Sequence, residues 1–209
     1  MIAPKMQRMR IELAAVIALG SNLGDRERAL RDAVAAIGAL AEVVLTGASD
    51  IVESAALTLD GVDEGAPRYL NAIVTVRSAL TPEALLDALN GIERALGRVR
   101  AERWGDRTID LDIVTMGGLV SNDSRLTLPH PRAAERAFVL QPWLQLDPDA
   151  QLPGDGPDAG SVAALLTRVT DRVTWVEAAP LAAIAADRGT GEAAPLAANT
   201  AASVGRSSA

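Results

Sequence analysis

Asp110 and Asp112, two aspartates separated by one residue, carry the strongest chemical signal in this chain. Alternate side chains of a β-strand share a face, so both carboxylates are expected on one face, about 6.5–7 Å apart along the backbone. Neighbouring carboxylates repel each other unless a cation gathers them, and hard divalent ions such as Mg²⁺ prefer oxygen ligands. The alternative interpretation is an exposed strand edge that follows a solvated, charged loop.

Four arginines lie directly upstream of these aspartates, within the segment GRVRAERWGDR at 97–107. Guanidinium groups match the oxygens of phosphates with paired hydrogen bonds. Metal-binding carboxylates next to an arginine cluster indicate a nucleoside triphosphate that is held for phosphoryl-type transfer. The members of the cluster are Arg98, Arg100, Arg103 and Arg107.

The composition excludes several classes of function. A net charge of −7 over 209 residues argues against a nucleic-acid-binding surface, for which a basic face would be expected. The chain has no cysteine, which excludes thiolate chemistry and fits a cytoplasmic location. Lys5 is the only lysine and lies in the N-terminal extension, so a P-loop lysine is excluded. No apolar run is long enough to span a bilayer, so no membrane partner is expected.

Strand and helix patterns alternate along the chain. The segment 54–68 is polar and contains glycine, which predicts a loop, whereas Asp25 and Pro82 indicate helix starts. The order strand-helix-strand, strand-helix-strand is that of the ferredoxin-like split arrangement. Strands are predicted over 13–19, 43–52, 70–77, 108–116 and 173–176, and helices over 25–40, 82–96, from about 132, and 161–170.

The arginine and aspartate segment resembles the signature of the 6-hydroxymethyl-7,8-dihydropterin pyrophosphokinases of the folate pathway, which runs G-R-x-R, R-W-G-P-R and then D-[LI]-D-[LIV]. The likeness continues on both sides, in the order and spacing of the family, from about residue 14 to 175. Further matching blocks are ALGSNLGDR at 18–26, YLNA at 69–72 and LTLPHP at 126–131, the last followed by Arg136 and Phe138.

This resemblance implies an α+β fold in which a ferredoxin-like βαββαβ core is elaborated into an α-β-α sandwich. It implies a pyrophosphokinase domain over 13–177, preceded by an extension at 1–12. The tail at 178–209 is dominated by alanine, glycine, serine and threonine, has no apolar period, and is expected to be disordered.

The resemblance also assigns a pterin site. Tyr69 and Phe138, the only tyrosine and the only phenylalanine, fall where the family stacks its pterin. Asn71 shares a strand face with Tyr69, and its amide can both donate to and accept from a pterin edge. The alternative is that both rings simply fill the core. Trp104 would close over the ligands, and Thr58 would complete the site.

For the nucleotide, the family pattern implies that Arg98, Arg107, Asp110 and Asp112 are catalytic, and that the two aspartates hold two Mg²⁺ ions. ATP contacts are implied for Arg100, Arg103, Trp104, Arg125, Thr127, His130 and Arg136. The reaction implied is transfer of diphosphate from ATP to the hydroxymethyl oxygen of the pterin, with release of AMP. The partners expected are ATP and 6-hydroxymethyl-7,8-dihydropterin, bound by a monomer. Glu93 matches an acidic position of the family whose role stays open.

Two departures from the family pattern keep other functions open. Asp106 stands where the family usually has proline, which puts a carboxylate among the arginines. Of the T-P-x-G stretch on the pterin side, only Thr58 is recognisable here. A module that binds nucleotide or pterin without turnover would account for both changes. The third hypothesis is a ferredoxin-like interaction domain with an acidic surface, which would show no Mg²⁺-dependent nucleotide binding.

Overall fold

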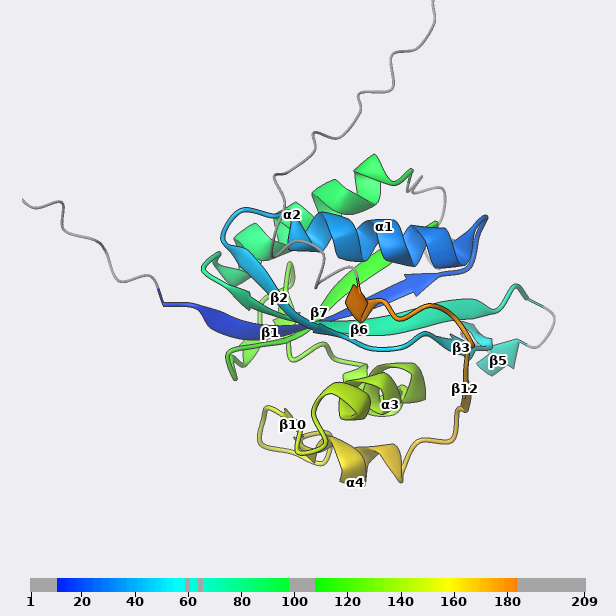
Figure 1. The fold of residues 1–209 in the computed structure, drawn as a ribbon. Helices are drawn as coiled ribbons and strands as arrows, with labels where there is room; N and C mark the ends of the chain where they lie inside the picture. Colours follow the sequence, from blue (N-terminus) through cyan, green and yellow to red (C-terminus); the bar gives the residue numbers. More distant parts are fainter. Residues whose placement is uncertain (1–10, 59–60, 64–65, 98–107, 184–209) are drawn as a thin grey trace, which may run out of the picture.

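A six-stranded antiparallel sheet forms the centre of the molecule (Figure 1). The structure is a computed structural model that describes residues 11–58, 61–63, 66–97 and 108–183. The strand order is β12-β3-β6-β1-β7, and β2 also pairs with β6. The strands are β1 (Leu13–Ser21), β2 (Val43–Ala48), β3 (Val52–Ser54), β6 (Tyr69–Ser78), β7 (Asp110–Met116) and β12 (Val173–Trp175).

Helices cover both faces of this sheet. In Figure 1, α1 and α2 lie on one face, and α3 and α4 lie on the other. Strands β1, β2, β6 and β7 with α1 and α2 give the βαββαβ core, so the predicted α+β fold and its three layers are confirmed. The helices are α1 (Arg26–Gly38), α2 (Pro82–Ala95), α3 (Ala137–Leu146) and α4 (Val162–Leu166), with a 3₁₀ turn, η1 (Ala133–Glu135), before α3.

The first two helices begin where their capping residues stand. The side chain of Asp25 accepts a hydrogen bond from the backbone N–H of Arg28 at 3.0 Å. At α2 the Thr81 hydroxyl accepts from the N–H of Ala84 at 3.2 Å, and Pro82 occupies the first turn. Each cap satisfies a backbone donor that a helix start would otherwise leave without a partner.

The sheet separates two hydrophobic cores. Ile17, Leu19 and their neighbours pack beneath α1 and α2, whereas Val16 and Ile73 pack with Trp143 of α3 on the other face. This division follows from strand geometry, because successive side chains point to opposite faces. The sheet therefore has no solvated face along its central strands, and an opening arises only where a helix does not cover it.

The prediction of one continuous strand over 43–52 is wrong. The chain leaves the sheet between β2 and β3, because Ser49 forms hydrogen bonds with both the carbonyl and the N–H of Ile73. Its N–H donates to the Ile73 carbonyl, and its hydroxyl accepts from the Ile73 N–H, each at 2.9 Å. These bonds to Ile73 replace the ladder that a continuous strand would make.

The loop predicted over 54–68 is also wrong in part, because a short hairpin forms within it. Strands β4 (Ala56–Thr58) and β5 (Gly61–Asp63) pair there. Two further hairpins, each of two-residue strands, lie outside the main sheet: β8 (Ser121–Asn122) with β9 (Thr127–Leu128), and β10 (Gln151–Leu152) with β11 (Gly160–Ser161).

The packed part of the chain continues beyond residue 177. Leu181 is fully buried in the core beneath α1 and α2. The Arg31 guanidinium of α1 donates to the carbonyl of Ala179 at 2.5 Å, which holds this segment against the helix. The extension at 1–10 and the tail from 184 lie outside the described residues.

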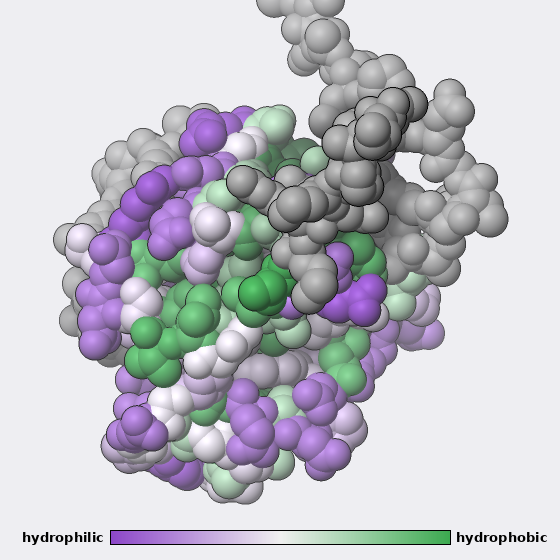
Figure 2. Space-filling view, turned by 90° about the vertical axis from the view of Figure 1, so that its left-hand side faces the viewer, coloured by the Kyte–Doolittle hydropathy of each residue, from purple (hydrophilic) through white to green (hydrophobic). Residues whose placement is uncertain are grey.

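On the face shown in Figure 2, apolar side chains lie in small groups between hydrophilic ones. Exposed apolar residues scattered in this way are normal for a folded domain. In the described part of the chain, every helix is too short or too polar to cross a lipid bilayer.

Replacing Leu181 by alanine tests whether the segment after β12 belongs to the domain. Because Leu181 is fully buried, Leu181→Ala should lower the free energy of unfolding by about 2–4 kcal/mol through lost burial and a residual cavity. The measurement is urea denaturation. Leu119→Ala is the control, because Leu119 is exposed and its loss should change stability by less than about 0.5 kcal/mol. Equal stability of both variants would show that the segment contributes nothing to the core.

Candidate active site

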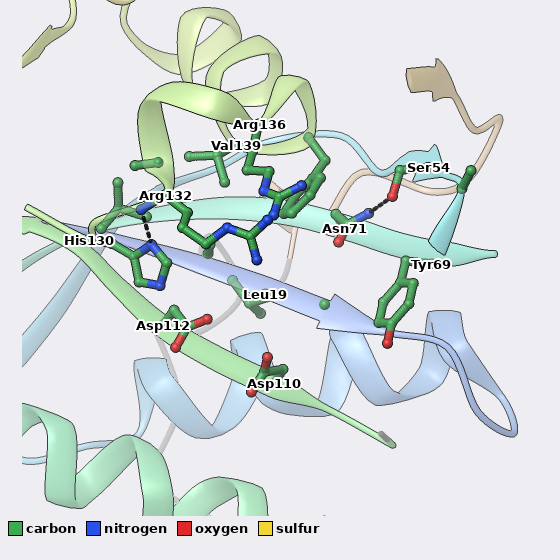
Figure 3. A pocket seen from close by; sticks show the side chains of 16 residues that line it. Leu19, Ser54, Tyr69, Asn71, Asp110, Asp112, His130, Arg132, Arg136 and Val139 are labelled. Carbon is green, nitrogen blue, oxygen red and sulfur yellow. Dashed lines mark hydrogen bonds between the residues drawn. The ribbon is translucent and has the colours of Figure 1, made fainter. Parts of the chain in front are cut away.

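A cavity of about 360 Å³ opens on the face of the sheet that carries α3 and α4. Its floor comes from β1, β6 and β7, and its roof from residues 130–139 (Figure 3). This volume lies within the range of small-molecule sites, roughly 300–1,000 Å³. The cavity therefore brings together two parts of the chain, the sheet and the start of α3, that the sequence keeps apart.

The strand register arranges the floor in rows. Asn71 of β6, Gly20 of β1 and Asp110 of β7 lie directly opposite one another, and the next row places Ala18 beside Asp112. Opposite residues of antiparallel strands share a face, so the amide and both carboxylates line the same cavity. Asp110 is half-buried, whereas Asp112 is exposed.

The prediction that the two aspartates share one strand face is confirmed. Leu111 and Ile113, which alternate with them, are buried in the opposite core. Figure 3 shows both carboxylates on β7 below the arginines of the roof. The chemistry that these carboxylates offer is thus directed into the cavity and away from the core.

Strand β7 lies at the edge of the sheet, and side chains hold the part of it that carries the aspartates. Glu93 of α2 is buried, and its carboxylate accepts a hydrogen bond from the N–H of Leu111 at 2.9 Å. The Ser21 hydroxyl donates to the carbonyl of Thr108 at 2.6 Å, just before the strand begins. Glu93, whose role was left open, therefore fixes the backbone between the two carboxylates.

Ser54, Tyr69 and Asn71 lie at one end of the cavity (Figure 3), and Phe138 also lines the cavity. The Asn71 side chain is buried, and its Nδ2 donates to Oγ of Ser54 at 3.0 Å. This bond fixes the orientation of the amide and leaves its carbonyl oxygen as the acceptor on the side of Gly20 (Figure 3). A flat ligand with ring N–H donors fits an end that combines aromatic faces with a fixed amide.

Arg132, Arg136 and His130 line the roof opposite the aspartates (Figure 3). Arg136 directly precedes α3, whose first backbone N–H, that of Ala137, donates to both carboxylate oxygens of Asp171 at 3.0 and 3.1 Å. Burial raises the pKa of Asp171, although the bond from Ala137 acts in the opposite direction. A residue from the C-terminal part of the domain thus holds the start of α3, where Arg136 and Phe138 enter the cavity.

His130 is held as a neutral imidazole. Its Nδ1 accepts a hydrogen bond from the N–H of Arg132 at 3.3 Å, so the proton of the neutral ring sits on Nε2. Burial lowers the pKa of His130 below 6.5; the Asp110 charge raises it, and the Arg132 charge lowers it further. The ring can therefore donate from Nε2 to an anionic oxygen without carrying a charge in the free protein.

Not all residues implied by the resemblance lie in the described cavity. Arg125 pairs with Asp87 of α2 at the surface, and the Thr127 hydroxyl donates to the carbonyl of Asp123 at 3.1 Å; neither lines the cavity. Thr58 belongs to β4, but its side chain is outside what the structure describes. The implied residues that lie outside the described residues are Arg98, Arg100, Arg103, Trp104 and Arg107.

Sequence reasoning missed Ser54 and Arg132, both of which line the cavity. The signal for Arg132 was present, since it is two residues after His130 and four before Arg136. Ser54 had no local signal, because it reaches the site only through its pairing with Tyr69 across β3 and β6.

Carboxylates facing arginines across one cavity, beside an aromatic end, define a site for phosphoryl-type transfer on an α+β fold. The family model for 7,8-dihydro-6-hydroxymethylpterin-pyrophosphokinase (HPPK) matches residues 16–148. The chain belongs to this family, which confirms the resemblance drawn from its motifs. It is 43% identical over 132 residues to the 2-amino-4-hydroxy-6-hydroxymethyldihydropteridine pyrophosphokinase of Bacillus subtilis, covering 63% of this chain and 77% of that protein. With the protein of the same name from Haemophilus influenzae it shares 39% identity over 141 residues, covering 68% and 86%.

Solved structures show the same fold. A crystal structure of a triple mutant of Plasmodium falciparum HPPK-DHPS with pteroate superposes with a TM-score of 0.59 at 12% sequence identity. The match covers 78% of this chain and 44% of that one, so this chain spans less than half the length of the Plasmodium protein. At such low identity the comparison supports the fold alone.

The single histidine of the chain allows a direct test of the site's electrostatics. In untagged, ligand-free protein, the His130 Hε1 resonance should titrate with a pKa below 6.5, because burial disfavours the charged ring. A lowered pKa means that the unfolded chain binds the proton more tightly. Relative to His130→Gln, the wild type should therefore keep its full stability above pH 6.5 and lose stability as the pH falls through the folded pKa. A folded pKa at or above that of the urea-unfolded chain would contradict this account.

Proposed function

We propose that this chain transfers diphosphate from ATP to the hydroxymethyl oxygen of 6-hydroxymethyl-7,8-dihydropterin in folate synthesis, with release of AMP. Membership of the family makes it a pyrophosphokinase, an ATP-dependent diphosphotransferase. The observation that carries the proposal is the single cavity that Asp110 and Asp112 share with Tyr69, Asn71 and Phe138. A site that must bring a phosphate chain up to a flat heterocycle needs these two sets of groups in one space.

The pterin occupies the end where Tyr69 and Asn71 lie, and it stacks on the aromatic rings of Tyr69 and Phe138. The Asn71 carbonyl accepts from a pterin N–H, and Ser54 keeps that carbonyl in place through the bond to Nδ2. Thr58 and Trp104 keep the pterin contacts that the family pattern gives them. This end is formed before the ligand binds, which lowers the entropic cost of ordering it.

The nucleotide phosphates occupy the space between the aspartates and the roof. Arg136, and with it Arg132, neutralises the oxygens that gain charge as the diphosphate moves, and Nε2–H of His130 donates to one of them. Further nucleotide contacts follow the family pattern, at Arg98, Arg100, Arg103, Trp104, Arg107, Arg125 and Thr127.

The donor set of the floor suits Mg²⁺. Asp110 and Asp112 offer carboxylate oxygens on one face, and within the described residues no third carboxylate or histidine completes a protein-only metal site. Mg²⁺ commonly binds in this way, through one or two carboxylates with substrate phosphates and water as its other ligands. Two such ions, when bound, would neutralise and orient the β- and γ-phosphates.

The protein's residues then contribute by holding the two reactants in place. The pterin hydroxymethyl oxygen attacks the β-phosphorus, and its hydroxyl proton is released to solvent. The bond from that phosphorus to the bridging oxygen on the α-phosphate breaks, and AMP leaves with that oxygen. Asn71 and the aromatic rings hold the nucleophile, while Asp110, Asp112 and the arginines hold the phosphate chain in line with it. A monomer in the cytoplasm, with no nucleic-acid or membrane partner, completes the proposal.

AMP release tests this proposal. The wild type should form AMP from ATP only when the pterin and Mg²⁺ are both present. Asp110→Ala should lower the rate roughly 10²- to 10³-fold, because the phosphate chain loses one of the two carboxylates that gather its cations. Asp32→Ala on α1 is the matched control, since that exposed carboxylate lies outside the cavity and its loss should leave the rate unchanged. A wild type that binds both substrates and forms no AMP would support the binding-module hypothesis instead.

Arg132 and Arg125 provide a second test. Arg132 lines the cavity, so Arg132→Ala should raise KM for ATP and lower kcat, with a combined loss in kcat/KM of roughly 10- to 100-fold. Arg125→Ala should have the smaller effect, because Arg125 pairs with Asp87 outside the cavity. Arg28→Ala, on the exposed side of α1, controls for the loss of one positive charge. The opposite ranking of Arg132 and Arg125 would contradict the phosphate position proposed here.

A further inference from the structure

Three charged side chains meet on the far side of the sheet from the cavity, behind its aromatic end. The Arg26 guanidinium donates to Oε1 of Glu53 at 3.2 Å and to the backbone carbonyl of Arg68 at 2.7 Å. Nε of Arg68 lies 3.1 Å from Oε2 of Glu53. The two groups form an ion pair, but the N–H does not point at the oxygen as a hydrogen bond requires. These side chains are half-buried, with exposures of 33% for Arg26, 28% for Glu53 and 41% for Arg68. We call them the Glu53 cluster.

Glu53 and Arg68 each directly precede a residue that lines the cavity. Glu53 precedes Ser54 at the end of β3, and Arg68 precedes Tyr69 at the start of β6. Ser54 and Tyr69 are paired across these strands. Since neighbouring side chains point to opposite faces, the cluster holds from behind the same backbone that presents Ser54 and Tyr69 in front.

Arg26 joins this backbone to a third element. It is the first residue of α1, so its two hydrogen bonds tie the helix start to the side chain of β3 and to the backbone before β6. The peptide between Arg68 and Tyr69 is thus fixed by a charged donor, and such bonds are the stronger ones. The cluster closes the base of the segment 55–67, which leaves the sheet after β3 and returns at β6.

We propose that Glu53 is a positioning residue for the pterin end of the site, acting through Arg26 and Arg68. The cluster holds Ser54 and Tyr69 in place before any ligand binds, so that Asn71 keeps its amide orientation and the Tyr69 ring has a fixed base. The identity of the ligand rests on the function proposed above; the positioning role rests on the contacts of the cluster.

The competing explanation is an ordinary surface ion pair with no effect on the site. The same sheet provides the comparison: Arg77, near the other end of β6, lies 3.4 Å from Glu12. Both of those side chains are more exposed, at 59% and 47%, and neither lines the cavity. Glu12→Gln therefore removes a carboxylate paired with the same strand without touching the cavity.

The experiment is equilibrium titration of the full chain with 6-hydroxymethyl-7,8-dihydropterin and, separately, with ATP and Mg²⁺. Glu53→Gln should raise the Kd of the pterin roughly tenfold, as expected for the loss of a charge-assisted contact, and should leave the Kd of ATP within about twofold. Glu12→Gln should change neither Kd.

Two results would overturn the proposal: an unchanged pterin Kd in Glu53→Gln, or equal weakening of pterin and ATP, which would indicate a general loosening of the fold. Arg26→Gln gives an independent check, since the double variant with Glu53→Gln should weaken pterin binding by less than the product of the two single effects. Titration measures binding and not turnover. A wild type that binds the pterin but releases no AMP would therefore refute the proposed function and leave this test valid.

Discussion

The antiparallel register of β6, β1 and β7 is the constraint on which the rest of the site depends. It aligns Asn71, Gly20 and Asp110 in one row, so that the amide and the first carboxylate are separated only by a glycine. A Cβ at Gly20 would lie 3.2 Å from Oδ1 of Asn71, inside the space that the amide oxygen needs. The open floor between the two functional groups thus follows from the absence of one side chain. A shift of the register by one residue would turn the carboxylates into the opposite core.

Because β7 is an edge strand, the sheet alone holds it by only one side. Glu93 reaches from α2 to the N–H of Leu111 and gives the outer edge a hydrogen-bond partner at the residue between the two aspartates. A buried carboxylate needs such a donor, and a backbone N–H at an open edge needs such an acceptor. Each group therefore satisfies the other. The same bond fixes the backbone at the residue between the two carboxylates, which repel each other.

The sequence predicted those parts of the site that follow from local periodicity. Asp110 and Asp112, like Tyr69 and Asn71, share faces because they alternate along single strands, and the helix starts at Asp25 and Thr81 follow from capping chemistry. What could not be predicted depends on contacts between distant residues. Ser54 enters the site through its pairing with Tyr69, and the break after β2 exists because Ser49 binds the backbone of Ile73. A sequence pattern shows the tendency of each segment to form a strand, but it does not show which other strand that segment pairs with.

The position of the cavity follows from where α3 begins. Val16 and Ile73 on that face of the sheet pack against α3 and its neighbours, whereas Ala18 and Gly20 line the cavity beside the start of the helix. Small residues there leave space that no roof side chain fills, and Arg132 and Arg136 border it from the segment just before α3. Asp171 fixes that segment through Ala137, so a carboxylate from the C-terminal part of the domain sets the distance between roof and floor. The width of the site is therefore a property of the whole fold, including residues that touch no ligand.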